Sequence, residues 1–191
     1  YARLRDIEGG THKTYLFMPF IFGEWKTART VEFEEPAFKI SGKLRGSASS
    51  LLSDISFLQA QIKMEYYMPI SEKNRFIFRG ELGHTKIDSN DLTKLPPSVR
   101  FYAGGDNSVR GYRLDGIGEY GYRNEIVGGK KLAVISAEYE HKVRPDFAAA
   151  LFIDAGDAFN GSRPSFKVGA GAGIRWYSPI GSVRFDLAHG F

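Results

Sequence analysis

The stretch that decides the fold is Leu58-Gln59-Ala60-Gln61-Ile62-Lys63-Met64-Glu65-Tyr66, because apolar and polar side chains alternate strictly along it. Successive side chains of a β-strand point to opposite faces, so the apolar residues of this stretch share one face and the polar residues share the other. A tilted strand of about ten residues crosses a bilayer. A two-faced strand of this length is typical of a barrel wall between lipid and a water-filled lumen.

The same period of two returns along most of the chain. It is clear in residues 38–45, 75–82, 133–140, 167–176 and 182–187. With a segment around residues 151–155 and a less regular one at about 14–29, which contains Pro19, the sequence predicts about eight strands. The alternation predicts five lipid-facing residues: Ile62, Ile135, Leu151, Ile174 and Phe185.

The connections alternate between two kinds. Short turns that contain proline are predicted at residues 68–73, 143–146 and 178–181, and longer polar loops at 46–54, 87–130 and 159–164. Membrane barrels have short periplasmic turns and long outer loops. Five aromatic residues precede the short turns, where an aromatic girdle is expected at the lipid interface: Tyr66, Tyr67, Tyr139, Trp176 and Tyr177.

Composition excludes several classes of protein. The formal net charge of +4 is too small to indicate a nucleic-acid partner, and no apolar run reaches the roughly 18 residues of a transmembrane helix. The chain has no cysteine, which removes disulfides and thiolate chemistry. No signal peptide follows Tyr1, so the start is expected to lie inside a larger protein.

The strands of a soluble β-sandwich also alternate between apolar and polar residues, but they usually run five or six residues, whereas the segments here run about ten.

The longest connection contains the stretch Phe101-Tyr102-Ala103-Gly104-Gly105-Asp106-Asn107-Ser108-Val109-Arg110-Gly111-Tyr112. Downstream stand Ser136-Ala137-Glu138-Tyr139, Phe152-Ile153-Asp154-Ala155-Gly156 and Ser178-Pro179-Ile180-Gly181-Ser182-Val183-Arg184-Phe185-Asp186. From about Ala37 to the end, the chain resembles the outer-membrane BamA/TamA superfamily, also called the bacterial surface antigen family. The tyrosine at the loop tip and the Ser-Pro-Ile-Gly run are most similar to the TamA branch.

The resemblance implies an all-β, antiparallel transmembrane β-barrel of 16 strands, with the loop at about 87–130 folded into the lumen. It implies a loop tip of Val109, Arg110, Gly111 and Tyr112, preceded by Gly104, Gly105 and Asp106. Strand alternation points two carboxylates inward, those of Glu138 and Asp154. Arginine has five donors in a planar fork, so Arg110 is expected to bridge these acids and latch the loop to the wall. The alternative is an ordinary loop arginine above a wet lumen.

Residues 1–191 are therefore expected to be part of a barrel domain. Residues 182–188 resemble the penultimate strand of the family, which would place the last strand, about the first seven strands and the periplasmic domains outside this sequence. The rival interpretation takes Phe191 as the C-terminal aromatic signal of outer-membrane proteins.

The sequence motifs that could suggest catalysis, a cofactor or a metal lack the context that such sites need. The Gly116-Ile117-Gly118-Glu119-Tyr120-Gly121 spacing fits a dinucleotide loop, but no apolar strand precedes it and no amphipathic helix follows. Gly169, Gly171 and Gly173 fall on the lumen face of a strand, where small residues make room for a loop or a plug. The four histidines lack metal-ligand spacing. We expect no catalytic residue, no cofactor and no metal.

The resemblance implies a barrel in the bacterial outer membrane that inserts or exports other proteins without bond chemistry. Its expected partners are the lipid bilayer and client outer-membrane or secreted proteins, with a periplasm-spanning partner subunit as a third kind and no nucleic acid. Alternatives are a two-partner-secretion transporter pore, a passive porin and a soluble β-sandwich binding module.

Overall fold

A computed structural model describes residues 2–5, 11–27, 33–50, 53–88, 94–122, 124–178 and 181–191. Its strands are β1 (Ala2–Arg5), β2 (Thr11–Thr14), β3 (Phe20–Lys26), β4 (Ala37–Ser47), β5 (Phe57–Ser71), β6 (Asn74–Ile87), β7 (Lys131–Arg144), β8 (Phe147–Phe159), β9 (Lys167–Ser178) and β10 (Gly181–Gly190). The described part of the long loop includes the 3-10 turn η2 (Pro97–Val99). No helix of the described residues is long and apolar enough to cross a membrane.

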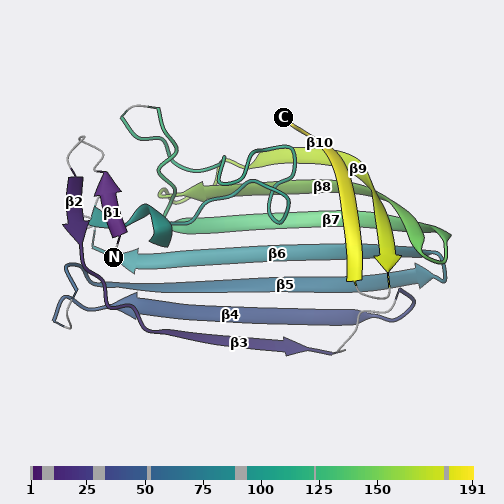
Figure 1. Cartoon of the computed structure of the whole chain (residues 1–191), viewed down its shortest axis with the longest axis horizontal. Helices are drawn as coiled ribbons and strands as arrows, with labels where there is room; N and C mark the ends of the chain where they lie inside the picture. Colours follow the sequence, from purple (N-terminus) through teal and green to yellow (C-terminus); the bar gives the residue numbers. More distant parts are fainter. Residues whose placement is uncertain are drawn as a thin grey trace.

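Eight strands form one curved antiparallel sheet in chain order from β3 to β10 (Figure 1). This confirms the predicted all-β fold and the strand number, and a single sheet is not a sandwich. The first strand of this sheet, β3, begins at Phe20, directly after Pro19, because proline has no N–H to donate to a neighbouring strand. Residues 28 and 29 of that predicted strand lie outside the described residues. A separate hairpin of β1 and β2 was not expected from the alternation.

The sheet has two chemically different faces. The five residues predicted to face lipid, Ile62, Ile135, Leu151, Ile174 and Phe185, are all on the outer face and between 47% and 68% exposed. On the inner face, the chain neighbours of Ile135 and Leu151 are buried, and buried residues alternate with more exposed ones along β7 and β8. The outer face is thus apolar over the full width of the sheet, and the inner face carries the charged groups.

Aromatic rings of neighbouring strands meet on the outer face near the short turns. Trp25 packs on Phe38, Phe38 on Tyr66, Phe76 on Tyr139, and Phe147 on Trp176.

The aromatic prediction is wrong for two residues. Tyr67 and Tyr177 immediately follow outward-facing residues, so the period of two turns them inward. The hydroxyl of Tyr67 donates to Glu65 and that of Tyr177 donates to Glu140.

The connections differ in length between the two ends of the sheet. Two residues join β5 to β6 and two join β7 to β8, whereas the connection from β6 to β7 runs from residue 88 to 130. That long loop folds back along the sheet (Figure 1). Four of its residues share an apolar cluster with the inner wall: Phe101, Ala103, Val109 and Ile117. Of the predicted connections, residues 51–52, 89–93, 123 and 179–180 lie outside the described residues.

Candidate functional site

The tip of the long loop is shaped by glycine. Gly104 and Gly105 have φ angles of 101° and 95°, in the left-handed region where a side chain is disfavoured. The turn they make is closed by hydrogen bonds from the amide of Gly105 to the carbonyl of Tyr112 and from the amide of Ser108 to the carbonyl of Gly105. As a result Val109 and Arg110 point into the wall, and both are buried.

Arg110 is held by two carboxylates of the inner wall. Its Nε and Nη2 donate to the two oxygens of Asp154 at 2.7 and 2.9 Å, and its backbone N–H donates to the same carboxylate at 3.1 Å. Its Nη1 donates to Oε2 of Glu138 at 2.6 Å. The structure thus brings the loop arginine onto both acids that strand alternation turned inward. The side chain of Arg110 is only 2% exposed, so water hardly screens these contacts.

The wall also supports the flat face of the guanidinium. The Cζ of Arg110 lies 3.4 Å from the centre of the Phe152 ring, a cation–π geometry. The hydroxyl of Ser136 accepts from Nη2 at 3.4 Å, and Asp186 of β10 accepts from Nη1 at 3.3 Å. Arg110 therefore contacts β7, β8 and β10 at once.

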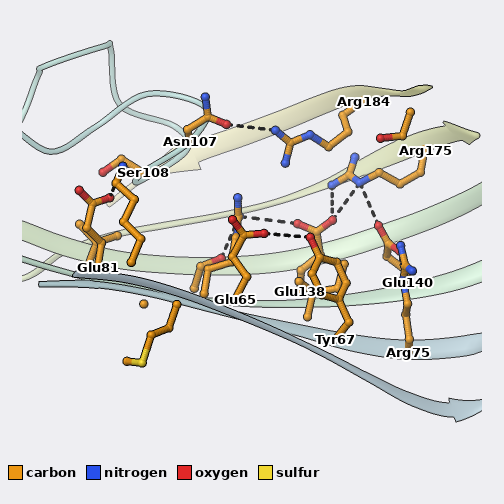
Figure 2. A pocket seen from close by; sticks show the side chains of 18 of the residues that line it. Glu65, Tyr67, Arg75, Glu81, Asn107, Ser108, Glu138, Glu140, Arg175 and Arg184 are labelled. Atoms are coloured by element: carbon orange, nitrogen blue, oxygen red, sulfur yellow. Dashed lines mark hydrogen bonds and ion pairs between the residues drawn. The ribbon is translucent and has the colours of Figure 1, made fainter. Parts of the chain in front are cut away.

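A second arginine completes the network from the strand side. Arg175 of β9 donates to Glu138 through Nε and Nη2 at 2.9 and 2.6 Å, and to Asp186 through Nη1 at 2.5 Å. Figure 2 shows Arg175 directed between Glu138 and Glu140. Glu138 and Asp186 are each shared between Arg175 and Arg110, so the loop and β9 are linked through common acids.

The charges of this network balance. Arg79 reaches Glu138 and Asp154 at 3.8 Å, and Arg75 pairs with Glu140 at 2.6 Å. With Arg110 and Arg175, four arginines therefore face four acids: Glu138, Glu140, Asp154 and Asp186. Charges taken out of water are tolerated when they are paired and hydrogen-bonded in this way. Burial opposes the charge of Arg110, but the bonds to Asp154 and Glu138 outweigh it and raise the pKa of Arg110 above its ordinary value. Arg110 therefore keeps its charge in the contact with Asp154 and Glu138.

The remaining residues predicted for the tip have distinct surroundings. Val109 is fully buried among Val134 and other apolar residues. Gly111 has a φ of 91°, and Tyr112 donates from its hydroxyl to the carbonyl of Phe191. Asp106 is exposed at the turn and takes no part in the ion-pair network.

Sequence reasoning missed four partners of the latch: Ser136, Phe152, Arg175 and Asp186. Each lies on the inner face of its strand, so the alternation that placed Glu138 and Asp154 on that face places these four there too. Phe152 carried a further signal, because it is an aromatic residue on an otherwise small or polar face.

The loop has a second anchor near its start. The buried amide of Gln59 on β5 donates to the carbonyl of Val99 at 2.8 Å and to the hydroxyl of Thr85 at 2.7 Å. Arg45 of β4 donates to the same carbonyl at 3.1 Å. The 3-10 turn η2 thereby rests on β4 and β5, while the loop tip rests on β7 to β10.

A cavity of about 530 Å³ lies beside the network on the inner face. It is lined by residues of both charges, among them Lys63, Glu65 and Arg184, and Arg184 donates to Asn107 of the loop (Figure 2). The described residues include no cluster of three or more histidine or acidic side chains that could hold a metal ion. Glu138, Asp154 and Asp186 all bond to Arg110, so their carboxylates hold the loop tip against the wall.

Comparison with known proteins agrees with this architecture. The family model for the Omp85 superfamily domain matches residues 39–191. The chain is similar to the outer membrane protein assembly factor BamA of Nitratidesulfovibrio vulgaris, with 30% identity over 72% of the chain and 18% of that protein. It is also similar to the chloroplastic outer envelope protein 80 of Arabidopsis thaliana, with 31% identity over 60% of the chain and 15% of that protein.

A third relative is the outer membrane protein assembly factor BamA of Neisseria meningitidis, which is 25% identical over 72% of the chain and 22% of that protein. The crystal structure of BamA from Haemophilus ducreyi lacking POTRA domains 1–3 superposes with a TM-score of 0.69 at 21% identity, over 90% of this chain and 38% of that chain. This likeness shows the fold. The chain spans about a fifth of the length of the curated relatives that it matches.

Proposed function

The chain belongs to the Omp85 superfamily, and from this we propose that it is the part of an outer-membrane barrel that carries the inward loop of a protein assembly or export machine. The observation that carries the proposal is the contact of Arg110 with Asp154 and Glu138, which fastens the loop to the wall. Holding a loop in the lumen is a geometric task that needs no bond chemistry. The superfamily resemblance expected from the loop motif is confirmed, and its nearest branch, TamA, stays a prediction.

We further propose that the barrel is longer than this chain and has 16 strands. The described sheet ends at two edges, β3 and β10, and is not closed. An unpaired strand edge in a bilayer leaves backbone groups without partners, at a cost of several kcal/mol each. Further strands are therefore required to cover both edges.

The proposed partners follow from the two faces of the sheet. The apolar outer face suits the lipid of the outer membrane, and the clients are outer-membrane or secreted proteins whose strands pair with an exposed edge through backbone hydrogen bonds. A periplasm-spanning subunit is a further proposed partner. The family names of the relatives, two of which are assembly factors, support the assembly role.

The test compares loop variants of the full-length protein in lipid vesicles. Removing Arg110 leaves Asp154 and Glu138 with less counter-charge in a buried site, so Arg110→Ala should slow the insertion of an added client barrel by about tenfold or more. Arg110→Lys keeps the charge but loses the planar fork, so it should restore only part of the rate.

Arg113→Ala is the matched control, because Arg113 lies on the same loop but is exposed. It should insert the client at the parental rate, with the strand content of all three variants unchanged. Parental rates for Arg110→Ala and Arg110→Lys would overturn the proposal that the latched loop serves assembly.

A further inference from the structure

The inner wall carries a row of aligned residues beneath the loop tip. Strand register places Ser136 of β7 opposite Asp154 of β8, Asp154 opposite Gly169 of β9, and Gly169 opposite Gly190 of β10. Directly paired residues of an antiparallel sheet point to the same face. The row therefore begins with hydrogen-bonding groups for Arg110 and ends in two glycines.

These two glycines are the points where the loop backbone comes closest. A Cβ atom on Gly169 would overlap the carbonyl oxygen of Arg110. A Cβ on Gly190 would lie 2.6 Å from Cε2 of Tyr112 and 3.0 Å from the carbonyl oxygen of Gly111. At Gly169 the obstacle is a backbone atom, so any other residue there would push the loop tip away from the wall. At Gly190 the nearest obstacle is the ring of Tyr112, which would have to shift.

Two more glycines on other strands face the loop in the same manner. A Cβ on Gly83 of β6 would lie 2.5 Å from the ring of Phe101, and one on Gly156 of β8 would lie 2.7 Å from Cγ2 of Val109. Between them β7 has no glycine in its described length and instead packs Val134 against the same loop residues.

Gly46, Gly171 and Gly173 are also crowded, but by residues of the strands themselves and not by the loop. On the outer face, Gly80 of β6 would bring a Cβ no nearer than 4.0 Å to Met64, and Gly42 of β4 no nearer than 4.0 Å to the carbonyl of Gln61. Glycine costs conformational entropy in a strand, so its presence at the four positions that the loop crowds needs a reason, and the loop supplies one.

We propose that Gly83, Gly156, Gly169 and Gly190 form a docking track that positions the long loop by shape, with Gly169 as the positioning residue that lets Arg110 reach Asp154. The glycines meet the loop in chain order, at Phe101, Val109, Arg110 and Tyr112. The inference deepens the proposed function and rests on it, because it names the wall residues that seat the latch. Replacing one of these glycines by alanine changes the shape of the wall but not its charge. The effect of the glycines can therefore be measured separately from that of the ion pairs.

The experiment is amide hydrogen exchange of residues 101–112 in the full-length protein in vesicles. The N–H of Arg110 donates to Asp154, so its exchange rate reports directly on docking. Gly169→Ala should speed exchange at Arg110 by about tenfold or more, because it opposes a backbone atom that cannot turn aside. Gly83→Ala should have a smaller effect, centred on Phe101, since an aromatic ring can shift.

Gly80→Ala is the control, with the same substitution on the same strand as Gly83 but on the outer face. It should leave exchange unchanged. If Gly169→Ala and Gly83→Ala both exchange at the parental rate, the track is wrong, whatever happens to client insertion. If Gly169→Ala speeds exchange while client insertion stays parental, the track stands and the proposed role of the docked loop in assembly fails.

Discussion

Arg110 and Asp154 are joined by three hydrogen bonds, two from the guanidinium and one from the backbone N–H of the arginine. The carboxylate thus fixes both the side chain and the main chain of the loop tip. Glu138, in contrast, accepts a single bond from Arg110, and its other carboxylate oxygen accepts from Arg175. The two acids are therefore not equivalent anchors.

This difference predicts a ranking of two isosteric substitutions. Asp154→Asn should loosen the loop tip more than Glu138→Gln, by on the order of 2 kcal/mol. The reason is that the charged carboxylate of Asp154 accepts from both the guanidinium and the backbone N–H of Arg110. The measurement is trypsin cleavage after Arg110 in the full-length protein, since the buried arginine is protected while the loop is docked. Equal cleavage of the two variants would show that Asp154 is not the main anchor.

The second anchor predicts a local effect of one glutamine. Gln59→Leu removes the donor to the carbonyl of Val99 and should free η2 while the tip stays docked, costing about 1 to 3 kcal/mol locally. Hydrogen exchange should rise at the amides of Val99 and Arg100 and stay slow at Arg110.

Gln61→Leu is the control for this anchor, because Gln61 lies on the same strand and face but bonds Glu81 of the wall instead of the loop. Faster exchange at Val99 in both variants would assign the effect to general loosening of β5.

The two faces of β5 predict opposite responses to a new charge. Ile62→Arg would place a cation against lipid, at about 2 to 4 kcal/mol near the bilayer midplane, and should lower the fraction of folded barrel. Gln61→Arg is the matched neighbour on the inner face, where Glu81 can pair with it, and should fold normally. Folded fractions are read from the mobility of unheated and heated samples on SDS gels. Loss of folding in Gln61→Arg alone would mean that the two faces of β5 are reversed.

Much of this architecture could be predicted because a strand repeats every two residues. That period assigned the outward face of Ile62 and Ile135 and the inward face of Glu138 and Asp154 without any structure. It also could have corrected the girdle, since Tyr67 follows the outward Tyr66.

The alternation does not determine which residues of neighbouring strands lie opposite each other. It therefore could not show that Ser136, Asp154 and Gly169 fall in one row. Cross-strand register depends on turn geometry and on the lengths of whole strands. For the same reason the sharing of Asp186 between Arg110 and Arg175 was out of reach, although both inward faces were predictable.

The measurement that tests the central claim most directly is a double-mutant cycle between Arg110 and Asp154, with the rate of client insertion as the readout. If the two residues act through their contact, Asp154→Asn should add nothing to Arg110→Ala, because the carboxylate has already lost its partner in the loop. The interaction energy should then lie in the range of about 0.5 to 3 kcal/mol that contacting residues show. If instead the two effects on insertion add fully, Arg110 and Asp154 serve assembly independently, and the latch does not hold the loop for that purpose.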